Sequence, residues 1–113
     1  MVRVTVIASE TLVGELNACG LLINEIITNS MKYAFPDGRP GKIRISINSI
    51  DNNRIRLSIS DDGIGIPNEI DLRNANTLGL TLITALAENQ LDGELILNRE
   101  NGTEFQINFR DSK

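Results

Sequence analysis

Apolar and polar residues alternate in five short segments of the chain. The alternation is clearest in "VRVTVIA" (2–8), "KIRISINSI" (42–50) and "RIRLSIS" (54–60), and it returns in "ELILN" (94–98) and "TEFQINF" (103–109). Successive side chains of a strand point to opposite faces of a sheet, so this pattern predicts five strands. The polar segments "DNN" and "RENG" predict hairpin turns between the second and third strands and between the last two.

Two segments have a helical period instead. From about Leu12 to Ala34, apolar or small residues recur on one side of a helix, and its centre lies near Ile26, Ser30 and Ala34. The members of that side are Leu12, Leu16, Cys19, Ile23, Ile26, Ile27, Ser30 and Ala34. Two prolines and two glycines in "FPDGRPGK" (35–42) end this helix. A second helix is predicted from about Leu80 to Gln90.

The order of these elements predicts the fold class. A strand and a helix are followed by two strands, a long polar loop (61–79), a helix and two strands. Strands joined by hairpins, together with two helices, favour a two-layer α+β sandwich with one mixed, mostly antiparallel sheet and helices on one face. A chain of 113 residues suits one domain, so we expect residues 1–113 to form a single domain. The loop is long for such a domain, and loops of that length are usually functional or disordered.

Composition and charge exclude several classes of function. The chain has no histidine and one cysteine, Cys19, which rules out an internal disulfide and a zinc site of the usual nitrogen and sulfur ligands. Mg²⁺ remains compatible, because it needs only oxygen ligands and waters. The net charge is −4 and no long run of Lys or Arg occurs, which argues against a nucleic-acid surface. The sequence shows no membrane span and no signal peptide.

Three places carry candidate chemistry. Glu25, Asn29 and Lys32 share one face of the first helix at positions i, i+4 and i+7. This stripe is either an ordinary solvated face or a set of polar groups that hold a metal ion or orient a nucleophile.

The second place is "SISDDGIGIP", in which Asp61 ends a strand and glycines follow at 63 and 65. Such a pattern is usually a simple turn, although a carboxylate there can also accept hydrogen bonds from an amino group. The third place is Gly79, which is either a flexible entry to a core helix or the start of a helix whose free N–H groups face an anion.

The combination and order of these motifs resembles the GHKL ATPase superfamily. "LLINEIITNSMKYAFPDGRPGKIRI" resembles the N box of sensor histidine kinases, "SISDDGIGIP" their G1 box, and "NTLGLTLITALAENQLDGEL" their G2 box. "NGTEFQINF" resembles the hairpin that closes their catalytic domain. The resemblance covers about residues 5 to 110 and implies a Bergerat-type ATP-binding fold.

The resemblance also implies roles for single residues. Asn29 matches the Mg²⁺ ligand, and Glu25 matches the acidic catalytic residue that activates or orients the nucleophile. Asp61 matches the aspartate that reads the adenine amino group, and Thr103 a threonine that joins it there, usually through water. The remaining positions that match ATP-binding residues are Lys32, Tyr33, Gly63, Gly65, Leu78, Gly79 and Leu80.

The chain departs from the commonest histidine kinases in the region between Gly65 and Gly79. This segment, which corresponds to their ATP lid, is short and has no phenylalanine, and "TLGL" carries only one glycine. These features resemble a short-lid subfamily.

The resemblance implies a kinase catalytic domain that takes ATP and Mg²⁺. It would transfer the γ-phosphate to a histidine on a separate dimerisation domain, with a response regulator downstream in two-component signalling. The domain is expected to be a cytoplasmic fragment of a longer sensor kinase, itself monomeric and without membrane or nucleic-acid contacts, although the full-length protein is compatible with a membrane anchor. An anti-sigma-factor-type serine kinase of the same fold and a non-catalytic nucleotide-binding module are the alternatives.

Overall fold

A computed structural model describes residues 2–9, 12–35, 39–51, 53–64, 80–99 and 102–110, apart from the side chains of residues 13, 17, 18, 33, 80 and 81. Five strands form one sheet in the order β1-β2-β3-β5-β4. Their bounds are Val2–Ile7 (β1), Gly41–Ser49 (β2), Arg54–Asp61 (β3), Glu94–Asn98 (β4) and Thr103–Arg110 (β5). β1 runs parallel to β2 and the other three pairings are antiparallel, so the predicted mixed sheet is confirmed.

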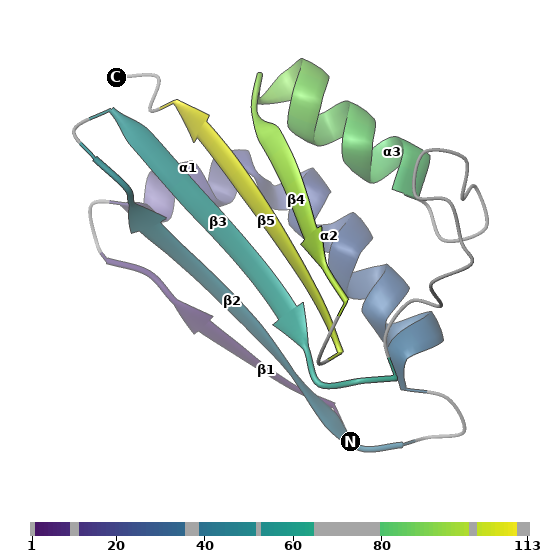
Figure 1. Cartoon of the computed structure of the whole chain (residues 1–113). Helices are drawn as coiled ribbons and strands as arrows, with labels where there is room; N and C mark the ends of the chain where they lie inside the picture. Colours follow the sequence, from purple (N-terminus) through teal and green to yellow (C-terminus); the bar gives the residue numbers. More distant parts are fainter. Residues whose placement is uncertain are drawn as a thin grey trace.

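Helical segments cover one face of this sheet and leave the other face open (Figure 1). They are α1 (Val13–Ala18), α2 (Gly20–Asn29), η2 (Ser30–Ala34), α3 (Leu80–Ala85) and η5 (Leu86–Gln90), where η marks a π-helical turn that directly continues the preceding α-helix. The two-layer α+β architecture is therefore the one expected from the order of elements.

The hydrophobic core lies between the sheet and the helices. Ile45 in β2, Leu57 in β3 and Ile107 in β5 alternate with polar residues, and each is almost fully buried. From the helical layer, Ile26 in α2 and Ile83 in α3 have no exposed surface. The period-2 pattern thus sends one set of side chains into the core and the other to the open face.

The prediction of one continuous helix from Leu12 to Ala34 is wrong in two places. The first helix is interrupted at Cys19, whose N–H is shared between the carbonyls of Glu15 (3.2 Å) and Leu16 (3.1 Å). Bifurcated bonds of this kind are common at helix ends, and Gly20 follows, a residue type that weakens a helix interior. The second departure is the π-helical turn η2, which begins at Ser30.

The predicted centre of the apolar side of this helix is nevertheless confirmed. Ile26, Ser30 and Ala34 are all buried against the sheet. Within the described residues, no helix is long and apolar enough to cross a membrane.

Candidate functional site

A buried aspartate lies where the third strand ends. β3 runs one residue further than the sequence pattern predicted, to Asp61, and Asp61 pairs with Thr103 at the start of β5. The side chains of both residues follow the buried face of the sheet, and only 8% of Asp61 and 5% of Thr103 is exposed. Two predicted site residues that are 42 positions apart in the sequence are therefore neighbours.

The carboxylate of Asp61 is oriented by two neutral donors. The Ser30 hydroxyl donates to Oδ2 at 3.0 Å, and the Gly63 N–H donates to Oδ1 at 3.0 Å. An ionised carboxylate offers about four lone-pair positions, so each oxygen keeps capacity for a further donor. The carboxylate is thus fixed in place while still able to accept hydrogen bonds.

Close packing of the backbone brings the end of β3 against η2. The N–H of Ile64 donates to the carbonyl of Ala34 at 3.1 Å. A Cβ at Gly63 would lie 2.4 Å from both the carbonyl oxygen and the Cβ of Ala34, so this contact needs glycine. Gly102 has φ of 84° and faces the carbonyl of Asp61, which a Cβ would approach to 2.2 Å.

Asp62 has a different environment from Asp61. Its Oδ1 accepts the Lys42 N–H at 2.8 Å, and its own N–H donates to the Lys42 carbonyl at 3.2 Å. The Arg39 guanidinium donates to the Asp62 carbonyl at 3.3 Å. Asp62 therefore attaches the chain to β2 directly after Asp61, which helps to hold Asp61 at the strand end.

The polar stripe of the first helix is split between two kinds of helix. Glu25 and Asn29 lie on α2 and are half-buried, whereas Lys32 lies on η2 and is exposed. A π-helical turn takes more residues per turn than an α-helix, so Lys32 follows Asn29 in a different helical geometry. Glu25 and Asn29 keep their α-helical spacing.

The other predicted residues are only partly within the described structure. Tyr33 lies in η2 and Leu80 begins α3, but neither side chain is described. Gly65, Leu78 and Gly79 lie outside the described residues. α2 and α3 are neighbours in the helical layer, so the start of α3 and the polar stripe belong to the same side of the sheet.

Ser30 was missed as a functional candidate by sequence reasoning, which assigned it to the apolar side of the helix. It is indeed buried, with 7% of its surface exposed. A serine between Ile26 and Ala34 was the available signal, because a buried hydroxyl needs a hydrogen-bond partner. The sequence could not name Asp61 as that partner.

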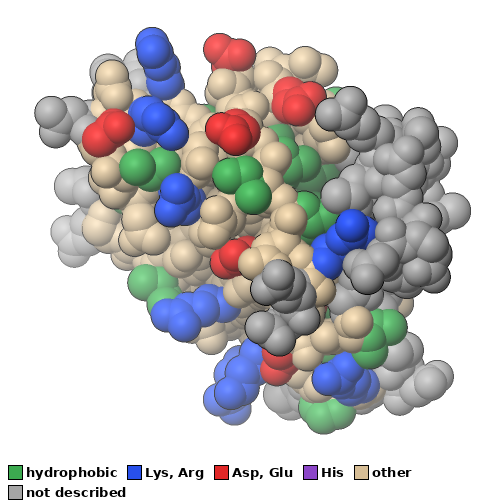
Figure 2. All heavy atoms as spheres, viewed as in Figure 1, with side chains coloured by type: hydrophobic (Ala, Val, Ile, Leu, Met, Phe, Trp, Pro, Cys, Tyr) green, Lys and Arg blue, Asp and Glu red, His purple; other side chains and the backbone are tan. Residues whose placement is uncertain are grey.

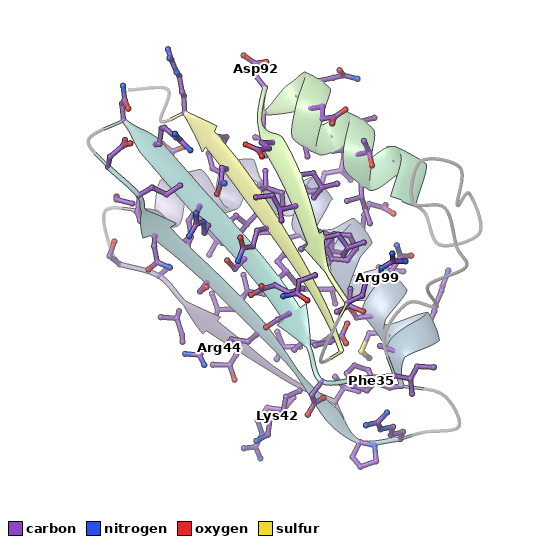
Figure 3. The ribbon with its side chains drawn as sticks, in the orientation of Figure 1. Phe35, Lys42, Arg44, Asp92 and Arg99 are labelled. Atoms are coloured by element: carbon purple, nitrogen blue, oxygen red, sulfur yellow. The ribbon has the colours of Figure 1, made fainter. Side chains whose placement is uncertain are left out.

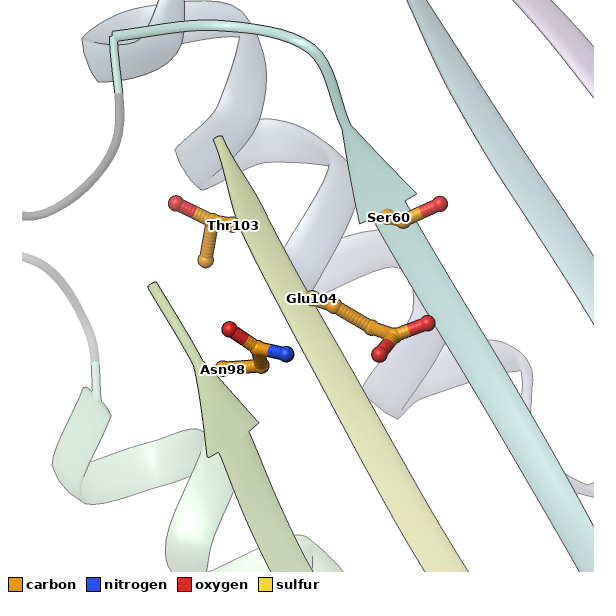
Figure 4. A pocket seen from close by; sticks show the side chains of 4 residues that line it. All are labelled: Ser60, Asn98, Thr103 and Glu104. Carbon is orange, nitrogen blue, oxygen red and sulfur yellow. The ribbon is translucent and has the colours of Figure 1, made fainter. Parts of the chain in front are cut away.

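A shallow hollow near this end of the sheet is lined by Ser60, Asn98, Thr103 and Glu104 (Figure 4). Ser60 and Glu104 directly adjoin Asp61 and Thr103 in their strands, so their side chains point to the opposite face. Thr103 lines this hollow and also lies beside Asp61, so the hollow adjoins the site around Asp61 from the open face of the sheet.

The described residues contain no group of three or more His, Cys, Asp or Glu that is arranged to hold a metal ion. Mg²⁺ does not require such a cage, because it keeps several waters and commonly takes one or two protein oxygens plus substrate phosphates. The amide oxygen of Asn29 is an oxygen donor of the required type.

The mixed five-stranded sheet with helices on one face matches the fold of GHKL-type ATP-binding domains. The family described as "Histidine kinase-, DNA gyrase B-, and HSP90-like ATPase" matches residues 14–113. The chain therefore belongs to this family.

The relatives that match this chain in sequence are histidine kinases. The chain is 33% identical over 90 residues to blue-light-activated histidine kinase 2 of Erythrobacter litoralis, covering 80% of this chain and 25% of that protein. It is 30% identical over 90 residues to sensor histidine kinase PdtaS of Mycobacterium tuberculosis, covering 77% of this chain and 18% of that protein. The chain thus spans a quarter or less of the length of these relatives.

A solved structure has the same fold. The blue-light activated histidine kinase of Erythrobacter litoralis EL346 superposes with a TM-score of 0.80 at 30% identity, covering 96% of this chain and 35% of that one. Sequence and fold together support a histidine-kinase type of catalytic ATP-binding domain.

Proposed function

We propose that this domain binds ATP with Mg²⁺ and transfers the γ-phosphate to a histidine on a separate dimerisation domain. The observation that carries the proposal is the buried Asp61 carboxylate, held by Ser30 and Gly63 opposite Thr103, in a chain of this ATPase family. The proposal assigns to Asp61 the exocyclic amino group of adenine.

The chemistry of Asp61 fits that assignment. A carboxylate accepts hydrogen bonds only, and adenine presents an amino donor where guanine presents a carbonyl. Ser30 and Gly63 fix the orientation of the carboxylate before the nucleotide arrives, which lowers the entropy that binding must overcome. Thr103 supplies a hydroxyl beside Asp61 for a direct or water-mediated contact.

We assign the phosphate end of the nucleotide to the polar stripe. Asn29 would hold Mg²⁺ through its amide oxygen, and the exposed Lys32 would meet phosphate oxygens. Bound Mg²⁺ neutralises the charge that develops on the phosphates during transfer. Tyr33, Gly65, Leu78, Gly79 and Leu80 complete the proposed ATP site.

Glu25 lies one helical turn before Asn29 on α2. We assign to Glu25 the role of activating or orienting the nucleophile. Since the chain has no histidine, the acceptor must lie on another domain or another chain. We therefore propose that residues 1–113 are the single catalytic domain of a longer sensor kinase. The phosphorylated histidine would then pass its phosphoryl group to a response regulator. We propose that both steps take place in the cytoplasm.

Isothermal titration calorimetry with Mg·ATP and Mg·GTP tests the nucleotide assignment. Asp61→Asn should weaken ATP binding by about 1.5–3 kcal/mol, the range for hydrogen bonds to charged groups, and should affect GTP less. Asp92→Asn is the matched control, because Asp92 is exposed at the far end of the sheet (Figure 3) and asparagine tolerates its φ of 51°. ATP affinity that is equal in wild type and Asp61→Asn would refute the role of Asp61.

Transfer in trans tests the reaction. The isolated domain should bind Mg·ATP and hydrolyse it only slowly, and it should phosphorylate a histidine-bearing dimerisation domain of a related kinase. Rapid hydrolysis without an acceptor would favour an ATPase of the gyrase type. Labelling of a serine instead of a histidine would favour the serine-kinase alternative, and ATP binding without any transfer would favour a non-catalytic module.

A further inference from the structure

The open face of the sheet has a charge opposite to that of the whole chain. Among the residues that the structure describes, six Lys and Arg residues and two Asp and Glu residues occupy outward strand positions on this face. The basic residues are Arg3, Lys42, Arg44, Arg54, Arg56 and Arg110, and the acidic residues are Glu94 and Glu104. Basic side chains gather over β1, β2 and β3 (Figure 2), and the labelled Lys42 and Arg44 extend away from the sheet in Figure 3.

The register places like charges directly opposite each other. Arg3 pairs with Lys42 across β1 and β2, and Arg54 pairs with Arg110 across β3 and β5. Like charges opposite one another destabilise a sheet, whereas opposite charges at these positions would stabilise it. The isolated sheet therefore carries electrostatic repulsion that an anionic partner would relieve.

Solvation of an exposed face does not explain this arrangement. Acidic residues would solvate the face equally well, and the chain contains more of them than basic residues. Within β1, β2 and β3, which are described throughout, every charged residue that points to the open face is basic. Asp51 lies between β2 and β3 and Asp62 follows the end of β3, and the Asp62 carboxylate already accepts the Lys42 N–H.

We propose that the open face of the sheet is a docking surface for a protein segment rich in aspartate and glutamate. Five of its six basic residues are arginines, whose planar guanidinium groups bind carboxylates through paired hydrogen bonds. Ser46, Ser58 and Gln106 lie between the basic positions and add neutral hydrogen-bonding groups. The face is not flat, because it has a hollow at one corner. This hollow is lined by Arg3, Pro40, Gly41, Lys42 and Asp62.

The same face fits nucleic acid and membranes less well. Phe35, Phe105 and Phe109 are buried, and Tyr33 belongs to η2 in the helical layer, so the outward positions of the five strands offer no aromatic platform for bases. The face of a five-stranded sheet is also broader than the α-helix or two-stranded β-ribbon that a major groove admits. At the outward positions of the five strands, Ile7 and Ile96 are the exposed large apolar residues, which is little for insertion into lipid.

Fluorescence anisotropy tests the proposal with a labelled peptide of repeating Glu-Ser units. Arg44 is exposed on β2 and lies outside the proposed ATP site, so Arg44→Glu should weaken peptide binding about three- to thirtyfold through lost attraction and new repulsion. Arg3→Glu is a second variant on the neighbouring strand. Lys32→Glu makes the same change in net charge on the helical side and should leave peptide binding within about twofold.

Melting curves and Mg·ATP titrations of the Arg44 and Arg3 variants separate this proposal from the proposed catalytic function. Both variants should fold and bind ATP as the wild type does, and peptide binding should weaken as salt rises. Equal losses in the Arg44, Arg3 and Lys32 variants would overturn the proposal, because only net charge would then matter. Tighter binding to duplex DNA or to phosphatidylserine vesicles than to the peptide would also overturn it.

Discussion

Ser30 and Asp61 are 31 positions apart in the sequence, and their side chains meet at 3.0 Å in the core. Ser30 is buried on the helical layer, and Asp61 is the last residue of its strand. If the hydroxyl sets the orientation of the carboxylate, then Ser30 contributes to nucleotide affinity even without touching the ligand.

Ser30→Ala tests this contribution. The variant should weaken Mg·ATP binding by about 0.5–1.5 kcal/mol, the usual net value of one hydrogen bond, as measured by calorimetry. Ser58→Ala on β3 is a matched control, because Ser58 points to the open face. Equal affinity in both variants would show that Ser30 serves packing alone.

Glu25 and Asn29 should fail in different ways when each is replaced by alanine. Asn29→Ala should remove the Mg²⁺-dependent part of ATP binding. Glu25→Ala should leave binding largely intact and slow transfer to a histidine-bearing partner domain by about 10²–10⁴-fold, as expected for a group that acts on the nucleophile. Both residues are half-buried on α2, away from Ile26, so neither change should unfold the domain.

Melting curves, Mg²⁺-dependent binding and phosphotransfer in trans distinguish these outcomes. Lower melting temperatures with normal ATP binding in both variants would mean that the stripe is structural. If only Glu25→Ala lost ATP binding, then Glu25 would be the Mg²⁺ ligand and Asn29 would act on the nucleophile.

At the scale of elements, the contact between the end of β3 and η2 decides the geometry of the site. The Ile64 N–H bonds the Ala34 carbonyl, and Gly63 allows this approach because a Cβ would collide with Ala34. The same short segment carries Asp61 and its donor Gly63. A substitution that disturbs this contact should therefore lower both the ATP affinity and the stability of the domain.

Gly63→Ala should destabilise the domain and weaken ATP binding together. The Ala34 contact is largely to backbone, which cannot move aside at low cost, so a loss of about 1–3 kcal/mol in unfolding free energy is expected. Gly20→Ala is the matched control on α2, where a Cβ meets nothing within 4 Å. That substitution should raise stability by about 0.5–1 kcal/mol, because alanine favours a helix. Urea unfolding and calorimetry measure both effects, and a neutral Gly63→Ala would contradict the predicted collision.

At the scale of the whole molecule, burial of the single cysteine links stability to pH. Desolvation raises the pKa of the Cys19 thiol to about 11 from an ordinary value of 9.0, and the Glu15 carboxylate adds to the rise. The folded state therefore keeps its thiol proton at pH values where the unfolded chain has lost it. Stability from this group is complete below about pH 9 and is lost as the pH rises towards 11.

Cys19→Ala should remove this part of the pH dependence. Each unit of pKa difference corresponds to about 1.4 kcal/mol. Between pH 8 and 11, the unfolding free energy of the wild type should therefore fall by at most about 3 kcal/mol more than that of the variant. Urea unfolding at both pH values measures the difference, and other groups that titrate there are common to both proteins. Parallel losses in wild type and variant would contradict the burial argument.

The basic residues of the open face are dispersed along the sequence and come together only in the folded sheet. Each of "KIRIS" and "RIRLS" carries only two basic residues, and no run of them is long. Alternation sends all four of these to one face, and the pairing of β1, β2, β3 and β5 then adds Arg3 and Arg110. Counting basic residues along the sequence argued only against a nucleic-acid surface and did not reveal the basic face that the sheet creates.

The sequence by itself determined the elements, the fold class and the order of the motifs. Alternation at period 2 and recurrence near period 3.6 depend on neighbouring residues alone, so the strands and the buried positions Ile26, Ser30 and Ala34 were predictable. The break at Cys19 and the π-helical turn at Ser30 were not, because a continuous pattern of apolar residues does not reveal where backbone hydrogen bonds change partner.

Only the tertiary structure decided which polar groups meet. The pairing of Asp61 with Thr103 follows from the order of strands in the sheet, and the bond from Ser30 follows from where η2 crosses the end of β3. The like-charge pairs of the open face have the same origin in strand register. Such contacts depend on distances between segments far apart in the chain, and a local pattern of residues does not contain those distances.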